Sequence, residues 1–330
     1  MPGLRVTGTP SLNISVPLTT VGCTTTDYCL AVGTTTLEAG ATSTAQVIGP
    51  TGGWHSITIS PIPAGTVSRV ACGAHTCLIS GRDATGAFLL TWSVGDASTT
   101  SVSLPDKFLG IADLTCSPTT TLDTCTAVSD SEPPAFAVSQ DFGRTWTPII
   151  LLSQWLTATK ATVVDVRCST TSCAAVGTTA TGLSAVQLNP GPSTSTTSSI
   201  STTSTSILSS PATVSSTLSL AKKTLVTTWC DHLEPTHCTV IVRSADSATH
   251  ATSFSGVGQH HVVVPAGHTI ACATQSGCVA ITSSGVLAAT NWHHSLSVTQ
   301  TYVPDHFVSV ACGTTRCAAI STTTATYFRP

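Results

Sequence analysis

The sequence predicts an all-β protein, a seven-bladed β-propeller with four-stranded antiparallel blades. Its 14 cysteines fall into seven close pairs, and the first cysteines of successive pairs are 40 to 62 residues apart. Between the pairs the chain carries several short β-prone runs and no helical period. Repeats of about 40–50 residues with this content are typical of propeller blades. The cysteine pair therefore marks one recurring position in each blade.

Each cysteine pair lies in a predicted β-hairpin. A β-branched run leads into the first cysteine, a short polar loop follows, and a small apolar run leaves the second, as in Val70-Ala71-Cys72 and Cys77-Leu78-Ile79. Residues that face each other across a hairpin have Cβ atoms about 4.5–5.5 Å apart, which is close enough for a disulfide bond. One disulfide per blade is predicted: Cys23–Cys29, Cys72–Cys77, Cys116–Cys125, Cys168–Cys173, Cys230–Cys238, Cys272–Cys278 and Cys312–Cys317.

The remaining strands follow from the short apolar runs between the hairpins. Closed all-β rings are often single domains of this length, so we predict one domain over residues 1–330. The strands predicted after the first cysteines of blades one to three are Cys29–Gly33, Ala45–Ile48, Ser56–Pro61, Cys77–Ser80, Ala87–Trp92, Thr100–Leu104, Ala135–Val138 and Pro148–Leu152.

The two ends of the chain are predicted to share the seventh blade. The residues after Cys312 and those before Cys23 together make up about one blade length. Three strands are expected from the C-terminal end, Val308–Ala311, Ala318–Ser321 and Ala325–Arg329, and the outer strand from Arg5–Val16. This arrangement closes the ring by pairing one terminal strand against the other.

One turn carries a specific motif. The segment Ser139-Gln140-Asp141-Phe142-Gly143-Arg144-Thr145-Trp146 has the pattern S-x-D-x-G-x-T-W and lies between the third and fourth predicted strands of blade three. It resembles the Asp-box of the sialidase-like BNR-repeat propellers, which occupies the same turn. The resemblance implies a structural turn formed by Ser139, Asp141, Gly143, Thr145 and Trp146, away from an active face.

Blade four contains an insertion. After Asn189 and a proline-glycine segment, the chain is almost purely Ser and Thr as far as Pro211. Such a stretch has too little apolar surface to fold by itself, and its composition is mucin-like. We predict a disordered loop at about residues 190–211, in place of this blade's third-to-fourth turn.

Composition limits the compartment and the partners. Seven cysteine pairs favour an oxidising compartment, so a secreted or cell-surface protein is predicted, although residues 1–5 lack the pattern of a signal peptide. Charged residues are 8% and the formal net charge is −3, which gives no basis for nucleic-acid binding. The chain has no apolar run of 18 residues, so no transmembrane segment is predicted.

Zinc is the alternative interpretation of one cysteine pair. His232 and His237 lie between Cys230 and Cys238, and two sulfurs with two imidazoles could bind Zn²⁺. However, the spacing departs from C-x₂₋₄-C with H-x₃₋₅-H, and the other six hairpins lack paired histidines. We therefore predict no metal site and no cofactor.

Sialidase activity is the enzymatic alternative. The resemblance implies an arginine triad, a tyrosine nucleophile with a glutamate partner, and an acid/base aspartate. The chain has few residues for these roles, and Tyr327-Phe328-Arg329-Pro330 matches the family's F/Y-R-I-P motif only in part. The only tyrosines and glutamates are Tyr28, Tyr302, Tyr327, Glu38, Glu132 and Glu234. We therefore predict a protein without catalytic residues.

The predicted function is a non-catalytic binding or structural module of the cell surface or of an extracellular assembly. Its partner would be a protein, a glycan or a second copy of the chain. The scarce charges gather in loops opposite the cystine turns, and this candidate binding face consists of Arg82, Asp83, Asp106, Lys107, Asp130, Glu132, Arg243, Asp246, Asp305 and His306. The alternatives are a degenerate glycan hydrolase and an assembly factor of a membrane complex, which would use an arginine patch at Arg69, Arg167 and Arg316.

Overall fold

A computed structural model gives the structure of part of the chain. It describes residues 5–6, 18–33, 44–50, 53–58, 65–117, 124–131, 135–148, 150–168, 173–189, 213–221, 224–230, 238–243, 249–253, 259–261, 267–274, 277–282, 287–290, 298–302, 306–321 and 324–329. Over these residues the chain forms seven four-stranded sheets and one α-helix, and neighbouring strands within each sheet are antiparallel.

We number the sheets by the order of their first strands. Sheet one contains β2 (Leu18–Cys23), β3 (Cys29–Gly33), β4 (Thr44–Ile48) and β5 (Trp54–Thr58). Sheet two contains β6 (Gly65–Cys72), β7 (Thr76–Asp83), β8 (Gly86–Ser93) and β9 (Thr100–Val102). Sheet three contains β10 (Ile111–Ser117), β11 (Thr124–Ser129), β12 (Phe136–Ser139) and β13 (Thr147–Pro148).

The helix α1 (Ile150–Thr159) leads to the second half of the chain. Sheet four contains β14 (Thr162–Cys168), β15 (Cys173–Thr179), β16 (Gly182–Asn189) and β17 (Thr213–Ala221). Sheet five contains β18 (Thr224–Cys230), β19 (Cys238–Arg243), β20 (Thr249–Ser253) and β21 (Gln259–His261). Sheet six contains β22 (Gly267–Thr274), β23 (Gly277–Thr282), β24 (Leu287–Thr290) and β25 (Val298–Tyr302). Sheet seven contains β26 (Phe307–Cys312), β27 (Cys317–Ser321), β28 (Ala325–Arg329) and β1 (Arg5–Val6).

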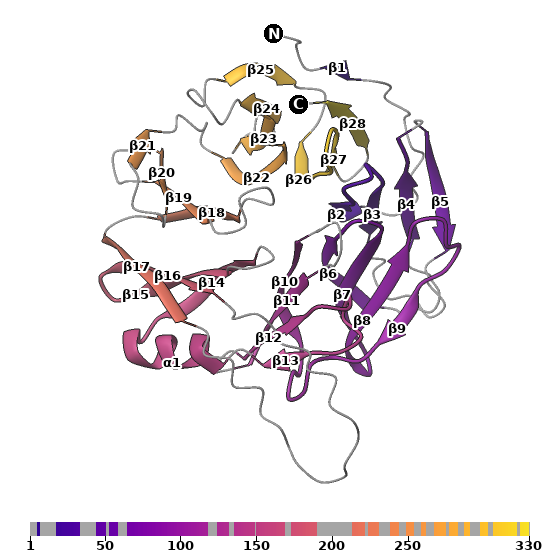
Figure 1. Cartoon of the computed structure of the whole chain (residues 1–330). Coiled ribbons are helices and arrows are strands. Elements are labelled where there is room, and N and C mark those ends of the chain that lie inside the picture. The colour runs from indigo at the N-terminus through magenta and orange to yellow at the C-terminus, as the bar shows by residue number, and fades with distance from the viewer. Residues whose placement is uncertain are drawn as a thin grey trace, which may run out of the picture.

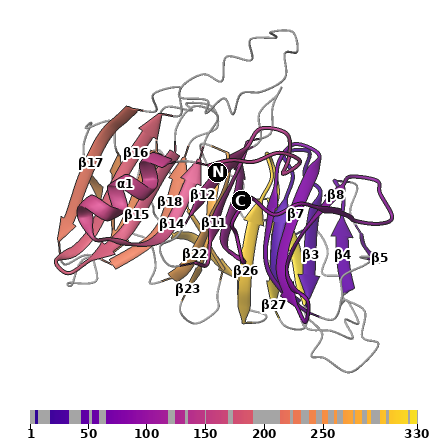
Figure 2. The same cartoon turned by 90° about the horizontal axis from the view of Figure 1, so that it is seen from below.

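The sheets are arranged around a common centre. Their first strands, β2, β6, β10, β14, β18, β22 and β26, lie innermost (Figure 1), and each of them contacts the first strand of the next sheet, with β26 contacting β2. Seen from below, the sheets stand side by side with their strands running roughly along the viewing plane (Figure 2). No helix among the described residues is long and apolar enough to cross a membrane.

The register pairs the two cysteines of every hairpin directly. Among the residues whose side chains are described, four disulfides are present: Cys23–Cys29, Cys72–Cys77, Cys116–Cys125 and Cys312–Cys317. In the other three hairpins the backbone brings the same partners opposite each other, and these pairs are Cys168 with Cys173, Cys230 with Cys238, and Cys272 with Cys278.

The cystines also pack against the preceding sheet. Cys77 belongs to a cluster with Leu30 of sheet one, and Cys125 to a cluster with Leu78 of sheet two. Likewise, Cys23 packs with residues of sheet seven, including Ile320. Each of these cystines therefore fills the interface between two neighbouring sheets as well as closing its own hairpin.

One predicted strand is wrong. The segment Pro148–Leu152 was expected to form the fourth strand of blade three, but only Thr147–Pro148 pairs as β13, and Ile150 begins the helix α1. The apolar residues recur here at helical spacing, and Trp155 and Leu156 are buried beside the core of sheets three and four. A short apolar run cannot by itself distinguish a strand from a buried helix, which explains the error.

Every first strand carries an extra residue at the same position. In all seven first strands, the residue four positions before the first cysteine has no partner in the pairing register. The residue after this unpaired one is polar in each strand. The skipped residues are Thr19, Ser68, Ala112, Val164, Val226, His268 and Val308. Such bulges bend a strand and increase its twist, and the repetition indicates that all seven first strands turn in the same way near the centre.

The ends of the chain meet in sheet seven. Arg5 pairs with Arg329 and Val6 with Phe328, so β1 lies beside β28. The rest of the outer strand predicted at Arg5–Val16 lies outside the described residues, as does the Ser/Thr-rich insertion, whose flanking strands β16 and β17 pair at Asn189 and Thr213.

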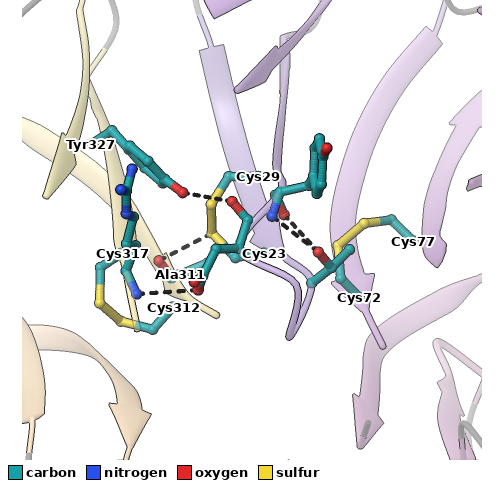
Figure 3. The surroundings of a disulfide bond; sticks show 12 residues. Cys23, Cys29, Cys72, Cys77, Ala311, Cys312, Cys317 and Tyr327 are labelled. Atoms are coloured by element: carbon teal, nitrogen blue, oxygen red, sulfur yellow. Dashed lines mark hydrogen bonds between the residues drawn. A yellow bond between two sulfur atoms is a disulfide. The ribbon is translucent and has the colours of Figure 1, made fainter. Parts of the chain in front are cut away.

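A second connection joins the first hairpin to sheet seven. Asp27, in the turn between β2 and β3, accepts hydrogen bonds from the Thr315 backbone N–H at 2.9 Å, from the Thr315 hydroxyl at 2.5 Å and from the Arg316 backbone N–H at 3.2 Å. The Tyr327 hydroxyl donates to the Asp27 carbonyl at 2.6 Å. Figure 3 shows Tyr327 reaching across to the first hairpin beside the three neighbouring cystines. We call Asp27 and its partners Thr315, Arg316 and Tyr327 the Asp27 clasp.

Candidate binding surface

An ion pair connects sheets two and three at the end opposite the cystine turns. Arg82 lies near the end of β7, and its Nη2 is 2.5 Å from Oδ2 of Asp130, which follows β11. The side chains of Arg82 and Asp130 are 55% and 37% exposed. The same Nη2 atom donates to the Leu109 carbonyl at 3.5 Å. The structure therefore brings the predicted site residues Arg82 and Asp130 together, and their ion pair lies beside the loop that contains Leu109.

That loop, residues 105–110, is held tightly against the two sheets. Phe108 is buried in the core between them and donates its backbone N–H to the Pro105 carbonyl. A Cβ atom at position 110 would meet the ends of the Arg82 and Asp130 side chains, so glycine lets the chain pass close to the ion pair without displacing them. With the loop held by these contacts, Leu109 is 76% exposed.

The loop also contains two of the predicted charges. Lys107 adopts a φ of 69°, a left-handed conformation that is uncommon for residues other than glycine, asparagine and aspartate. Asp106 and Lys107 are both exposed. The predicted pair therefore lies two and three residues before Leu109 on the chain and is accessible to a partner.

Asp83 has a local structural role. Its Oδ1 atom accepts hydrogen bonds from the backbone N–H groups of Thr85 and Gly86 and from the Thr85 hydroxyl. The Thr85 hydrogen bonds lower the pKa of this carboxyl below its ordinary value. The Asp83 carboxylate therefore closes the turn between β7 and β8. Gly86 in this turn has a φ of 137°.

The rest of the predicted face is described only in part. His306 is exposed immediately before β26, and Arg243 ends β19, but the side chain of Arg243 is not among those described. Glu132, Asp246 and Asp305 lie outside the described residues. The structure therefore brings Arg82 and Asp130 together and places Asp83, Asp106 and Lys107 in the β7–β8 turn and in the loop beside this ion pair.

A second ion pair lies on the first strands. Arg69 Nε is 3.4 Å from Asp113 Oδ1, where both residues follow the bulges of β6 and β10. Of the predicted arginine patch, Arg69 is thus paired, and Arg316 lies over the Tyr327 ring at 5.2 Å. The side chain of Arg167 is not among those described. The Arg69–Asp113 pair was not predicted, because nothing in the sequence relates two residues of different blades.

The turn at residues 139–146 is closed by its own side chains. Asp141 accepts hydrogen bonds from the Thr145 backbone N–H at 2.8 Å and from the Thr145 hydroxyl at 2.6 Å. The Ser139 hydroxyl donates to Asp141 and accepts from the Gly143 backbone N–H. Gly143 has a φ of 77°, and Trp146 packs on the core between sheets two and three. The turn therefore packs against both sheets, and the side chains of Ser139, Asp141 and Thr145 are hydrogen-bonded within it.

The pKa of Asp141 gives this turn a testable pH dependence. Burial raises the pKa, but the hydrogen bonds from Thr145, Ser139 and the Arg144 backbone together hold it below its ordinary value. A carboxyl whose pKa is lowered on folding stabilises the protein above its unfolded-state pKa of about 3.9, and the contribution is lost as the pH falls through the folded-state pKa.

We expect Asp141→Asn to be less stable than the wild type at neutral pH by no more than about 1 kcal/mol, since the group is largely solvated. The deficit should shrink as the pH falls below about 4, because the unfolded wild-type chain then takes up a proton that the folded Asp141 carboxyl binds less tightly. Urea unfolding between pH 7 and pH 3 measures it. A deficit of constant size over this range would contradict the role of the ionised carboxylate.

Of the tyrosines and glutamates considered for catalysis, two tyrosines make structural contacts, and the side chains of the others are not among those described. Tyr327 is buried and donates its hydroxyl proton to Asp27, and Tyr28 is partly buried in the core of sheets one and two. The three glutamates and the side chain of Tyr302 lie outside the described part. Within the residues that the structure describes, no group of His, Cys, Asp and Glu could hold a metal ion.

Comparison with known proteins identifies the fold. No protein-family model matches the sequence, and no curated protein sequence matches it. Among solved structures, YCF48 from Cyanidioschyzon merolae is similar with a TM-score of 0.63 and 13% identity over 99% of both chains. The β-propeller domain of Cps50 (Swd1) from Myceliophteria thermophila has a TM-score of 0.63 and 10% identity over 99% of both chains. YCF48 bound to D1 peptide has a TM-score of 0.60 and 10% identity over 100% of this chain and 97% of that chain. At these identities the likeness concerns architecture alone, and the chain has the fold of a β-propeller.

Proposed function

We propose that the chain is a non-catalytic binding propeller that recognises a polypeptide segment. Its site is the surface of sheets two and three opposite the cystine turns, formed by Arg82, Asp106, Lys107, Leu109 and Asp130. One observation carries the proposal: the Arg82–Asp130 ion pair holds a loop that exposes Leu109 between charged residues. Exposed polar and apolar groups held in fixed positions are what a recognition surface requires.

The choice of a polypeptide has independent support. The structure of YCF48 with which this chain is similar contains a bound peptide, the D1 peptide. The bound peptide is a property of YCF48, and it shows that a propeller of similar architecture can bind a peptide. On the proposed surface the exposed side chains include Arg82, Asp106, Lys107 and Leu109, so a peptide could make both polar and apolar contacts there.

The architecture proposed for this module is a single domain over residues 1–330 with seven blades. The contacts that connect each first strand to the next, and β26 to β2, support a closed ring. The pairing of β1 with β28 and the Asp27 clasp support closure between the two ends of the chain. We propose further that residues 139–146 form an Asp-box of the BNR type, which the Asp141 and Gly143 geometry supports.

We propose an oxidising location for the protein, at the cell surface or outside the cell. The disulfides support this location, because cytosolic thiols are kept reduced. The Ser/Thr-rich stretch at about residues 190–211 is proposed to protrude from the blade between β16 and β17 as a disordered loop.

The proposed function can be tested by phage display of random 12-residue peptides. Peptides selected on the disulfide-bonded protein should bind Arg82→Ala/Asp130→Ala at least tenfold more weakly, because the variant releases the loop and removes two polar contacts. The matched control is Arg69→Ala/Asp113→Ala, which removes the ion pair on the first strands and should bind as the wild type does. Binding only to a glycan array, or peptide binding that both double variants retain, would contradict the proposal.

A further inference from the structure

Leu109 differs from the other exposed aliphatic residues. Among the described residues, the large hydrophobic side chains that are exposed are Leu109, Val164 and Val308. The two valines occupy the bulges of β14 and β26, where an exposed residue follows from the strand geometry. Leu109 instead lies in a connection between sheets and is exposed to 76%. A single exposed leucine is ordinary on protein surfaces, so its significance depends on how it is held.

The loop that presents Leu109 is fixed from three sides. Phe108 anchors it in the core, and Arg82 donates to the Leu109 carbonyl. The Asp130 backbone N–H donates to the Gly110 carbonyl at 3.3 Å, while a side chain at position 110 would overlap the ion pair. The left-handed conformation of Lys107 adds local strain. Because the backbone on both sides of Leu109 is held, a partner that binds there orders the Leu109 side chain but little of the backbone.

The charges around Leu109 define the chemistry of the partner. Arg82 and Asp130 neutralise each other. Among the described residues, the other charged groups of the β7–β8 turn and of the loop at residues 105–110 are the carboxylates of Asp83 and Asp106 and the ammonium of Lys107. These three groups carry an excess of one negative charge. A complementary partner therefore combines an apolar contact with a basic side chain.

We propose that Leu109 is the anchor residue of the binding surface, and that it inserts between apolar side chains of a polypeptide segment that also carries lysine or arginine beside them. This inference rests on the proposed function and specifies its partner. Burial of a leucine side chain corresponds to about a 10- to 100-fold gain in affinity. The fixed loop makes that gain available, and the acidic excess selects basic segments.

The experiment uses the 12-residue phage-displayed peptides selected on the wild-type protein. Leu109→Ser should weaken their binding at least tenfold, and Leu109→Met, which keeps an apolar side chain, should restore most of it. Val308→Ser is the matched control, since Val308 is 48% exposed on a different sheet, and its binding should equal that of the wild type. The selected peptides should be enriched in apolar residues next to Lys or Arg, and their affinity should fall as salt is added.

The two proposals fail in different ways. Peptides that lose affinity for Arg82→Ala/Asp130→Ala but bind Leu109→Ser as they bind the wild type would overturn the anchor role and leave the proposed function standing. Enriched peptides that are acidic would overturn the assignment of partner charge. Failure to enrich any peptide on the folded protein would overturn both proposals. Circular dichroism and thermal unfolding of each variant establish that the fold is retained.

Discussion

Replacement of Asp27 by alanine is expected to lower the free energy of unfolding by about 3 kcal/mol and to loosen the contact between sheets one and seven. The carboxylate accepts two backbone N–H groups and one hydroxyl from the turn between β26 and β27. Hydrogen bonds to a charged group contribute about 1.5–3 kcal/mol each when buried, and partial exposure of this turn reduces the total to about 2 kcal/mol. Asp27 also has a φ of 63°, which costs alanine about 1 kcal/mol more.

Two variants separate these causes. Asp27→Asn tolerates the left-handed conformation and keeps one oxygen acceptor, so its loss of stability should be smaller than that of Asp27→Ala. Asp96→Ala, at another exposed aspartate, should change stability by less than about 0.5 kcal/mol. Urea unfolding gives the free energies, and hydrogen exchange should become faster in β26, β27 and β28. An Asp27→Ala protein as stable as the Asp96→Ala protein would show that the clasp does not hold the two sheets together.

The clasp illustrates what could not be predicted from the sequence. Asp27 and Thr315 are 288 residues apart, and no local pattern relates them. By contrast, the hairpins were predictable because their signal is local: the strand expected at Cys29–Gly33 has those bounds in the structure, and the strand expected at Ala318–Ser321 begins one residue earlier, at Cys317. Strand positions near each cysteine pair follow from alternation and turn residues, whereas contacts between sheets depend on the ring as a whole.

For the binding surface, the sequence predicted several of the charged residues but neither their contacts nor the exposed Leu109. The scarcity of charge in this chain points to Arg82 and Asp130 as site residues, but no local pattern predicts their ion pair, because they are 48 positions apart. Leu109 was missed because an apolar residue just before a strand is expected to be buried. Asp83 was selected for its charge, although the sequence Asp83-Ala84-Thr85-Gly86 is itself a turn signal. The same turn occurs at Thr179-Ala180-Thr181-Gly182, where a threonine hydroxyl replaces the carboxylate.

Reduction of the disulfides is expected to have the largest effect of all. A bridge that closes a loop of about six residues stabilises a protein by roughly 2 kcal/mol in the chain-entropy model. The four bridges among the described side chains have sequence separations of five to nine residues, so together they contribute on the order of 8 kcal/mol. The whole stability of a folded protein is typically about 5–15 kcal/mol. The reduced protein should therefore be largely unfolded at 37 °C.

A disulfide stabilises the protein in two ways, by constraining the unfolded chain and by packing its sulfur atoms in the core, and two treatments separate these contributions. The Cys77 sulfur lies in the core with residues of sheet one, and it still fills that space after reduction. Cys72→Ala/Cys77→Ala removes both the bridge and the sulfur volume, so it should destabilise by more than the roughly 2 kcal/mol of the bridge alone. Thermal unfolding with and without a reductant measures both effects, with the double variant in reductant as the reference. If the fully reduced protein keeps its melting temperature to within a few degrees, the bridges contribute only packing, and the stability argument for an oxidising location is lost.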